Sequence, residues 1–154
     1  MCIRDSLQEA KEQAANALEL ATASNNQEQQ AIASERLGKV AQQRFDYTNA
    51  VRYYLAAQNH WRAIDNKVGI AMTNLSVGEV YAVEDEIQQA LTYLNQANSS
   101  LEQAGKRKEL AKVKKLLGDV YYKQNFIGKA KANYEEAMNL YCLLYTSPSP
   151  RDRG

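Results

Sequence analysis

The feature that most constrains the fold of this chain is a repeat with a period of 40 residues. Three glycines, Gly38, Gly78 and Gly118, mark the period, and other small or apolar residues align with them without a gap. The aligned columns are Ala31, Ala71 and Ala111; Val40, Val80 and Val120; Ala50, Ala90 and Ala130; and Ala57, Ala97 and Ala137. Self-similarity at a period of this size is typical of stacked supersecondary units rather than of one closed core.

Each unit has the sequence pattern of two helices. Residues 7–23 are rich in Ala, Leu, Glu, Gln and Lys, which favour helices, and they align with the second helix of the later units. In the first complete unit, Tyr54, Ala57 and Trp61 recur at three- and four-residue spacing and form an apolar stripe. We therefore expect an all-α fold with a half repeat at 7–25 and helix pairs at about 28–65, 67–105 and 107–141. The turns should lie near residues 25, 45, 65, 85, 105 and 125.

The two ends of the chain resemble translated adapter DNA of the kind used to prepare sequencing libraries. Read as codons, one DNA element in opposite orientations can encode both residues 1–6 and residues 142–146, and residues 147–152 fit the adapter beyond it. Natural inverted sequences at the two ends would give the same pattern, but we adopt the adapter interpretation. Segments of this origin are excluded from fold reasoning. We expect residues 7–141 to form the repeat array and residues 142–154 to include a disordered tail.

The composition between these ends does not favour nucleic acid or membrane binding. Both cysteines, Cys2 and Cys142, lie in the ends, so cysteine usage does not indicate a redox compartment. The ends also hold three of the 19 basic and two of the 18 acidic residues, which leaves equal numbers of each sign in residues 7–141. No apolar run approaches the length of a membrane span. We therefore expect no nucleic acid and no membrane partner for this segment. The cellular location stays open, with the cytoplasm slightly favoured.

The aligned columns resemble the tetratricopeptide repeat, in which Leu-Gly is followed by Tyr and then by Ala, a large residue and Ala in the second helix. The third unit has Leu117, Gly118, Tyr121, Ala130, Tyr134 and Ala137; the second has Val77, Gly78, Tyr81, Ala90, Leu94 and Ala97. The first unit departs from the pattern with Ala41 at the Tyr position. The resemblance covers residues 7–141 and implies a right-handed superhelical array of antiparallel helix pairs. Gly in one helix and Ala in its partner would let the two helices approach closely.

Two departures from that family concern the length and the ends of each repeat. The usual Trp near the start and Pro at the end are absent, and the period is 40 rather than 34 residues. We expect the extra residues to lengthen the helices around the turn between repeats. This longer form resembles repeats of kinesin light chains and of many bacterial signalling proteins.

The resemblance also implies a concave groove lined by the first helix of each unit. The groove positions carried over are Glu35, Lys39, Gln42 and Gln43; Leu75, Glu79 and Val83; and Lys112, Lys115, Asp119, Tyr122 and Lys123. The carboxylate clamp of chaperone-tail-binding members is not formed, because Lys39 and Glu79 stand where the clamp has Asn. Since Lys112, Lys115 and Lys123 share one helix, we expect the acidic part of a peptide over the third unit and its apolar part near Leu75 and Val83.

No group of residues has the spacing of a catalytic or metal site. His60 is the only histidine, and no cysteine remains between the ends to complete a zinc site or a nucleophile–histidine pair. Glu84, Asp85 and Glu86 are not followed by the ligand spacing of a calcium loop, so we interpret them as a solvated turn. We therefore expect no enzyme activity, no cofactor and no metal.

The predicted function is a protein–protein interaction scaffold that forms part of a longer repeat array. The alternative is a sensory or regulatory peptide-binding domain that controls a fused signalling enzyme or transcription regulator. Both share one fold, so only flanking domains or a bound ligand would distinguish them. The expected partner is a protein or peptide with an acidic segment. The sequence leaves open the oligomeric state and whether the groove or the convex face binds.

Overall fold

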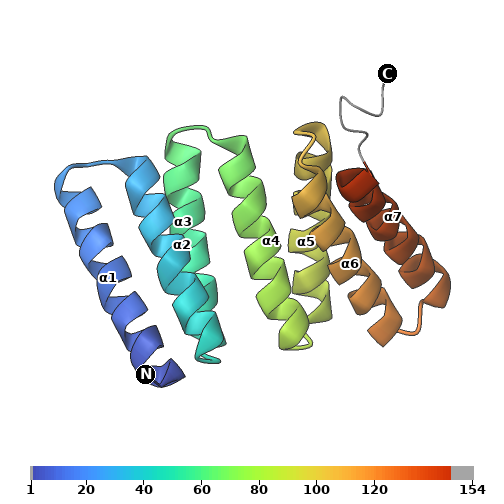
Figure 1. Ribbon diagram of the computed structural model, residues 1–154, viewed down its shortest axis with the longest axis horizontal. Helices are drawn as coiled ribbons and strands as arrows, with labels where there is room; N and C mark the ends of the chain where they lie inside the picture. Colours follow the sequence, from blue (N-terminus) through green and yellow to red (C-terminus); the bar gives the residue numbers. More distant parts are fainter. Residues whose placement is uncertain (1, 147–154) are drawn as a thin grey trace.

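Seven helices make up the part of the chain that the computed structural model describes, residues 2–146 (Figure 1). They are α1 (Ile3–Ala23), α2 (Gln27–Gln43), α3 (Tyr47–Ala63), α4 (Lys67–Val83), α5 (Ile87–Gln103), α6 (Arg107–Lys123) and α7 (Ile127–Thr146). Within these residues there is no strand. The chain is therefore the all-α array of helix pairs that the repeat predicted.

Each turn closes one helix and begins the next. The middle residue of every turn is left-handed, with φ between 52° and 68°, and these residues are Asn25, Phe45, Asp65, Asp85, Gly105 and Asn125. The residue after it donates its backbone N–H to a carbonyl five residues earlier, as Asn66 does to Trp61 at 2.9 Å, which is the hydrogen bond of a Schellman motif. The side chains of Asn26, Asp46 and Asn66 then cap the helices that follow. The turns lie at the predicted positions.

The aligned columns form the core, and each glycine of the period faces a large side chain of the partner helix. The alanine columns are buried, with Ala31, Ala50 and Ala71 fully so. A Cβ on Gly38, Gly78 or Gly118 would lie within 2.6–2.8 Å of the side chain of Tyr54, Leu94 or Tyr134, respectively. Each glycine thus makes room for the large residue of the partner helix. The sequence linked these glycines to a close approach of the two helices, and the structure adds that a large side chain fills the space beside each glycine.

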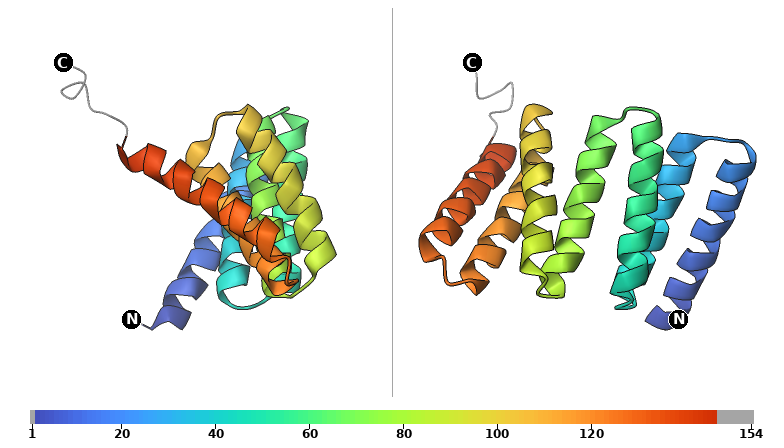
Figure 2. Two further views of the ribbon diagram at one scale, coloured as in Figure 1. Left: turned by 90° about the vertical axis from the view of Figure 1, so that its right-hand side faces the viewer. Right: turned by 180° about the vertical axis from the view of Figure 1, so that it is seen from behind.

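The helices stack in sequence order, as expected for a repeat array. Each helix packs on its neighbours along the chain, and α4 also contacts α6. The first helices of the units, α2, α4 and α6, lie on one side of the array, and α3 and α5 lie on the other (Figures 1 and 2). Seen along the stack, α1 and α7 are inclined differently from the helices between them, so the array twists along its length (Figure 2).

A cluster of polar side chains is buried between α3 and α4. Gln58 donates from Nε2 to Asn74 Oδ1 at 2.6 Å and to Thr73 Oγ1 at 3.1 Å. Thr73 in turn donates to the Ile70 carbonyl at 2.8 Å. One repeat later the column of Gln58 holds Asn98, whose buried Oδ1 has no hydrogen-bond partner among residues 2–146. The cost of burying the polar side chain of Gln58 is therefore offset by its hydrogen bonds, whereas Asn98 Oδ1, one repeat later, has none within the described part of the chain.

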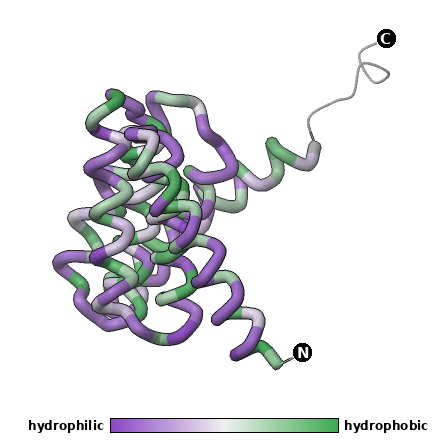
Figure 3. Tube along the Cα trace, turned by 90° about the vertical axis from the view of Figure 1, so that its left-hand side faces the viewer, coloured by the Kyte–Doolittle hydropathy of each residue, from purple (hydrophilic) through white to green (hydrophobic). Residues whose placement is uncertain are grey.

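Both terminal helices extend into the segments that the sequence assigned to adapter DNA. α1 begins at Ile3 rather than near Leu7, and Asp5 in its first turn interacts favourably with the helix dipole. α7 continues through Leu143 and Leu144, and its last turns are hydrophobic (Figure 3). The column of Gln58, buried in α3, holds Met138 in α7, which is 64% exposed. α7 therefore presents to solvent a face that α3 uses to pack on α4. The tail expected to be disordered, from residue 147, lies outside the described residues.

Candidate functional site

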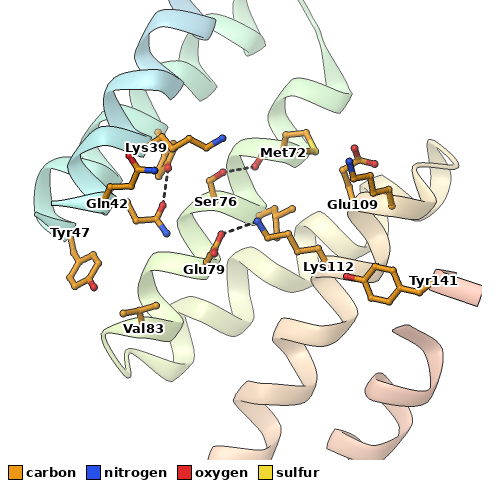
Figure 4. A pocket seen from close by; sticks show the side chains of 14 residues that line it. Lys39, Gln42, Tyr47, Met72, Ser76, Glu79, Val83, Glu109, Lys112 and Tyr141 are labelled. Carbon is orange, nitrogen blue, oxygen red and sulfur yellow. Dashed lines mark hydrogen bonds and ion pairs between the residues drawn. The ribbon is translucent and has the colours of Figure 1, made fainter. Parts of the chain in front are cut away.

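A hollow with a volume of about 680 Å³ lies over α2, α4 and α6. We call it the central hollow. Side chains from the three helices point into it, among them Lys39 and Gln42 of α2, Ser76 and Glu79 of α4, and Lys112 of α6 (Figure 4). A turn occurs every 20 residues, so the chain reverses direction at each turn and the first helix of every unit returns to the same side of the array. Residues of α2, α4 and α6 therefore share one surface.

Two further hollows extend the central one into a groove. The first, of about 520 Å³, lies at the N-terminal ends of α4 and α6 and shares Lys39, Met72 and Ser76 with it; we call it the N-end hollow. The second, of about 330 Å³, lies at the C-terminal ends of α4 and α6 and shares Glu79 and Val83; we call it the C-end hollow. Shared lining residues make the three hollows continuous, and together we call them the groove.

The structure places eleven of the twelve predicted groove residues along this surface, and Glu35 is the one that lines only the N-end hollow. Those in the central hollow are Lys39, Gln42, Gln43, Leu75, Glu79, Val83 and Lys112, and those in the C-end hollow include Asp119, Tyr122 and Lys123. Lys115 lines none of the three hollows. Leu75 is only 3% exposed and belongs to the core, so it forms the floor of the groove.

The three lysines predicted to attract an acidic ligand are paired with carboxylates of the chain itself. Lys112 lies 3.3 Å from Glu79, and Lys115 lies 3.8 Å from Asp119. Lys123 lies 2.7 Å from Asp85 and also donates to the Ala82 carbonyl. These pairs are largely exposed, so each contributes little to stability. They nevertheless offset the charge that a ligand would meet at these three positions.

Trp61 and Glu35 form the wall of the N-end hollow. Trp61 Nε1 donates to Glu35 Oε1 at 3.0 Å, and burial raises the pKa of the Glu35 carboxyl above its usual value. The ring of Trp61 lies over Gly69, where a Cβ would approach to 2.5 Å. The positions that align with Gly69 in the other units hold Gln29 and Glu109. A glycine at this position in the second unit alone was therefore a signal in the sequence that the Trp61 ring lies against the backbone there.

A buried tyrosine, Tyr54, and a partly buried one, Tyr134, hold polar groove residues in place. Tyr54 donates from its hydroxyl to Gln42 Oε1 at 2.8 Å, and Tyr134 donates to Asp119 Oδ1 at 2.5 Å. Burial is the main cause that raises the pKa of Tyr54, with the nearby Glu79 and Glu35 adding to it. Burial and the hydrogen bond to Asp119 raise the pKa of Tyr134 to about 12. Both hydroxyls are therefore neutral donors that orient Gln42 and Asp119.

Several groove residues were not among the predicted ones. Met72 and Ser76 of α4 line both the central and the N-end hollow, and Lys108 of α6 lines the central hollow. Met72 and Ser76 precede Glu79 at helical spacing, so the same face of the helix indicated them. Lys106 lines the N-end hollow from the turn before α6.

Outside the groove, the remaining features do not suggest chemistry. His60 Nδ1 lies 2.7 Å from Gln27 Oε1, a contact between α3 and the start of α2. Among residues 2–146, no group of three or more His, Cys, Asp or Glu is placed to hold a metal ion. In that same part of the chain, no helix is both long and apolar enough to cross a membrane. A smaller polar hollow of about 440 Å³ lies on the opposite face, between α3 and α5, and Thr92 lines it.

Comparison with known proteins places the fold. No family model matches the chain, and no curated protein matches it by sequence. Among solved structures, it is similar to the crystal structure of BtubC (BKLC) from P. vanneervenii, with a TM-score of 0.81 at 19% sequence identity. The likeness covers 95% of this chain and 61% of that one, so this chain spans about three fifths of the length of BtubC. At this identity the likeness shows a shared helical-repeat fold.

Proposed function

We propose that this protein is a non-catalytic, tetratricopeptide-like interaction scaffold that binds a peptide or partner helix in the groove over α2, α4 and α6. The observation that carries the proposal is the groove itself, which is open, continuous over three repeats and lined by both apolar and charged side chains. Pockets that combine an apolar lining with a few placed polar groups are the usual binding sites of folded domains. A cofactor, a metal and a nucleic acid are not part of the proposal.

The groove also suits a segment of polypeptide. Met72 and Val83 lie eleven residues apart on α4, a distance of about 16 Å along the helix. An extended segment of about five residues spans that distance. The hydroxyl of Ser76 and the amides of Gln42 and Gln43 lie between apolar side chains, where they are placed to bond a peptide backbone. A peptide-binding groove of this kind would serve a constitutive scaffold, or a domain that regulates a fused protein.

The test uses two matched substitutions on opposite faces of the array. Ser76→Tyr fills the groove, and Thr92→Tyr fills the hollow between α3 and α5; in the unmodified chain both hydroxyls donate to the carbonyl four residues earlier in their own helix. Peptides are first selected by display on the unmodified full chain. Their affinities for the three proteins are then measured by fluorescence anisotropy.

We expect Ser76→Tyr to weaken binding at least about tenfold, which corresponds to about 1.4 kcal/mol, and Thr92→Tyr to have no effect. Loss of binding with Thr92→Tyr alone would show that the opposite face, at α3 and α5, is the binding surface. If neither substitution changes the affinity, or if no peptide is selected, the groove is not a binding site. Circular dichroism of each variant confirms that the helices are retained.

A further inference from the structure

We propose, on the basis of the function proposed above, that the occupant of the groove is a peptide with chemically distinct ends. Its acidic residues lie over Lys39, Lys106 and Lys108, and a large apolar residue enters the C-end hollow at Val83 and Tyr122. This differs from the placement expected from the sequence, which put the acidic part over Lys112, Lys115 and Lys123. The ion pairs within the chain are the reason for the change.

The first observation concerns which lysines of the groove have carboxylate partners. Lys39, Lys106 and Lys108 line the central and N-end hollows, and within residues 2–146 none of them lies within 4.0 Å of a carboxylate. Lys112 and Lys123, which also line the groove, have partners in Glu79 and Asp85. Among the described lysines of the groove, a ligand carboxylate would therefore meet side chains without an ion-pair partner only at the first set.

The carboxylates that face the same hollows offset these three charges only in part, since Glu35 interacts electrostatically with Lys39 without forming an ion pair within 4.0 Å. Glu79 is paired with Lys112, and Glu35 accepts a hydrogen bond from Trp61. Glu109 lines the central hollow, and Arg36 adds a further cation to the N-end hollow. Cations therefore outnumber carboxylates along this stretch of the groove. A complementary potential of this kind steers an anionic partner and fixes its direction.

The position of the basic residues on α6 strengthens this charge imbalance. Lys106, Arg107 and Lys108 stand at the start of α6, where the helix dipole is positive and basic side chains are unfavourable. The helices α2, α3 and α4 begin with Asn or Asp side chains that accept a backbone N–H, whereas Lys106 before α6, like Glu86 before α5, makes no such hydrogen bond. Acidic residues of a ligand above this turn would relieve the repulsion.

The other end of the groove has the opposite character. Val83 is 52% exposed and Tyr122 is 63% exposed, and both line the C-end hollow together with Leu116. The charged residues at its edge are already engaged, since Lys123 binds Asp85 and Asp119 accepts from Tyr134. An apolar side chain of the ligand would cover Val83 and Tyr122 without displacing a charged group from water. In Figure 4, Lys39 lies in the upper part of the view and Val83 in the lower part, with Glu79 between them in height.

The experiment measures a defined probe against the full chain. The probe is a fluorescein-labelled synthetic peptide with three glutamates at one end, a short Ser-Gly spacer, and Leu-Phe at the other end. Its affinity is measured by anisotropy over a series of salt concentrations. Two probe controls are the same peptide with glutamine in place of glutamate and the same peptide with serine in place of Leu-Phe. We expect each control peptide to bind at least tenfold more weakly.

Protein variants then locate each end of the probe. Charge reversal of the three unpaired lysines, Lys39→Glu, Lys106→Glu and Lys108→Glu, is expected to weaken binding at least tenfold and to flatten the salt dependence. Reversal of three lysines outside the groove, Lys11→Glu, Lys129→Glu and Lys131→Glu, changes the net charge equally and is expected to leave the affinity within about twofold. Reversal of Lys112, Lys115 and Lys123 should have an intermediate effect, because a ligand would gain less from charges that are already paired.

The apolar end is tested with Tyr122→Ser, for which we expect about a tenfold loss, against Met138→Ser, an equally exposed residue outside the groove. The inference is overturned if reversal of Lys112, Lys115 and Lys123 has the larger effect, or if Tyr122→Ser has none. It is also overturned if an RNA oligonucleotide displaces the probe at a lower concentration than the unlabelled peptide does. If displayed peptides bind and Ser76→Tyr abolishes their binding while the acidic probe fails, the scaffold function stands and this inference does not.

Discussion

Gly78→Ala is expected to destabilise the array, although alanine favours helices more than glycine does. Gly78 is buried within α4, and a Cβ there would lie 2.7 Å from Cγ and Cδ2 of Leu94 and 3.3 Å from its backbone nitrogen. Leu94 has no exposed surface, so it cannot turn away without disturbing its neighbours. Gly128 in α7 is a matched control, because a Cβ there meets no atom within 4 Å.

The magnitude follows from two opposing effects. Replacing a helical glycine by alanine stabilises a helix by up to about 1 kcal/mol, and this is the whole effect expected for Gly128→Ala. Overpacking a rigid core costs about 1–3 kcal/mol. The net change in the free energy of unfolding for Gly78→Ala is therefore a loss of roughly 0–2 kcal/mol. The difference between the two variants, about 1–3 kcal/mol, measures the contact with Leu94 alone.

The assay is urea unfolding followed by circular dichroism, completed as a double-mutant cycle. Leu94→Ala removes the atoms that a Cβ on Gly78 would meet. In that background, Gly78→Ala should lose its penalty and stabilise the protein about as much as Gly128→Ala does. An equal cost of Gly78→Ala with and without Leu94 would refute the reasoning, as would a stabilising effect of Gly78→Ala in the otherwise unmodified chain.

Three further predictions concern the turns, the buried polar cluster and alkaline pH. Gly105→Ala should destabilise the protein by about 1 kcal/mol and Phe45→Asn should stabilise it, because both positions are left-handed and only Gly, Asn and Asp adopt that conformation readily. Thermal unfolding measures both changes, and a stability change of the same sign in the two variants would contradict this. Gln58→Ala should cost about 1–3 kcal/mol in urea unfolding, since it leaves buried partners unsatisfied, whereas Asn98→Ala in the same column should cost clearly less. The pKa of Tyr134 is raised from 10.0 to about 12, so the neutral form favours folding, and its stability contribution persists below pH 10 and disappears as the pH rises through 12. Because the pKa of Tyr54 is raised as well, the tyrosinate absorbance titration is done in a Tyr54→Phe background, where a group that still titrates near pH 12 after Tyr134→Phe would exclude the assignment.

The sequence predicted the helices and turns well because one physical signal repeats in every unit. A helix of fixed length must end at a residue that tolerates positive φ, and Asn, Asp or Gly stands at five of the six positions. The exception, Phe45, is left-handed although its side chain type disfavours that conformation. Its position was nevertheless predictable, because the period places a turn at residue 45 whatever residue occurs there. Repetition thus compensated for a weak local signal.

The charge distribution in the groove was not predictable in the same way. That Lys112, Lys115 and Lys123 share one helix follows from their spacing, and so does the pairing of Lys115 with Asp119 four residues later, but the partners of Lys112 and Lys123 do not. Lys112 pairs with Glu79, and Lys123 pairs with Asp85, both from the preceding unit. Which carboxylates come within reach depends on the twist between neighbouring units, and a repeat in sequence does not specify that angle. Which residues line the groove could therefore be inferred from the columns. The net charge that the groove presents depends on ion pairs that only the structure shows.

The length of the repeat has a consequence for the ligand that follows from the turns. α2 to α6 have 17 residues each, and three residues separate consecutive helices. With turns of the same size, a repeat of 34 residues would have helices of about 14 residues. The longer period thus adds about 4.5 Å to every helix, and it does so in both helices of a pair. Because the groove runs along α4, its floor is longer by the same amount, which corresponds to between one and two residues of an extended peptide. On the proposed function, the longer helices increase the distance along the groove between the basic start of α6 and the C-end hollow near its other end.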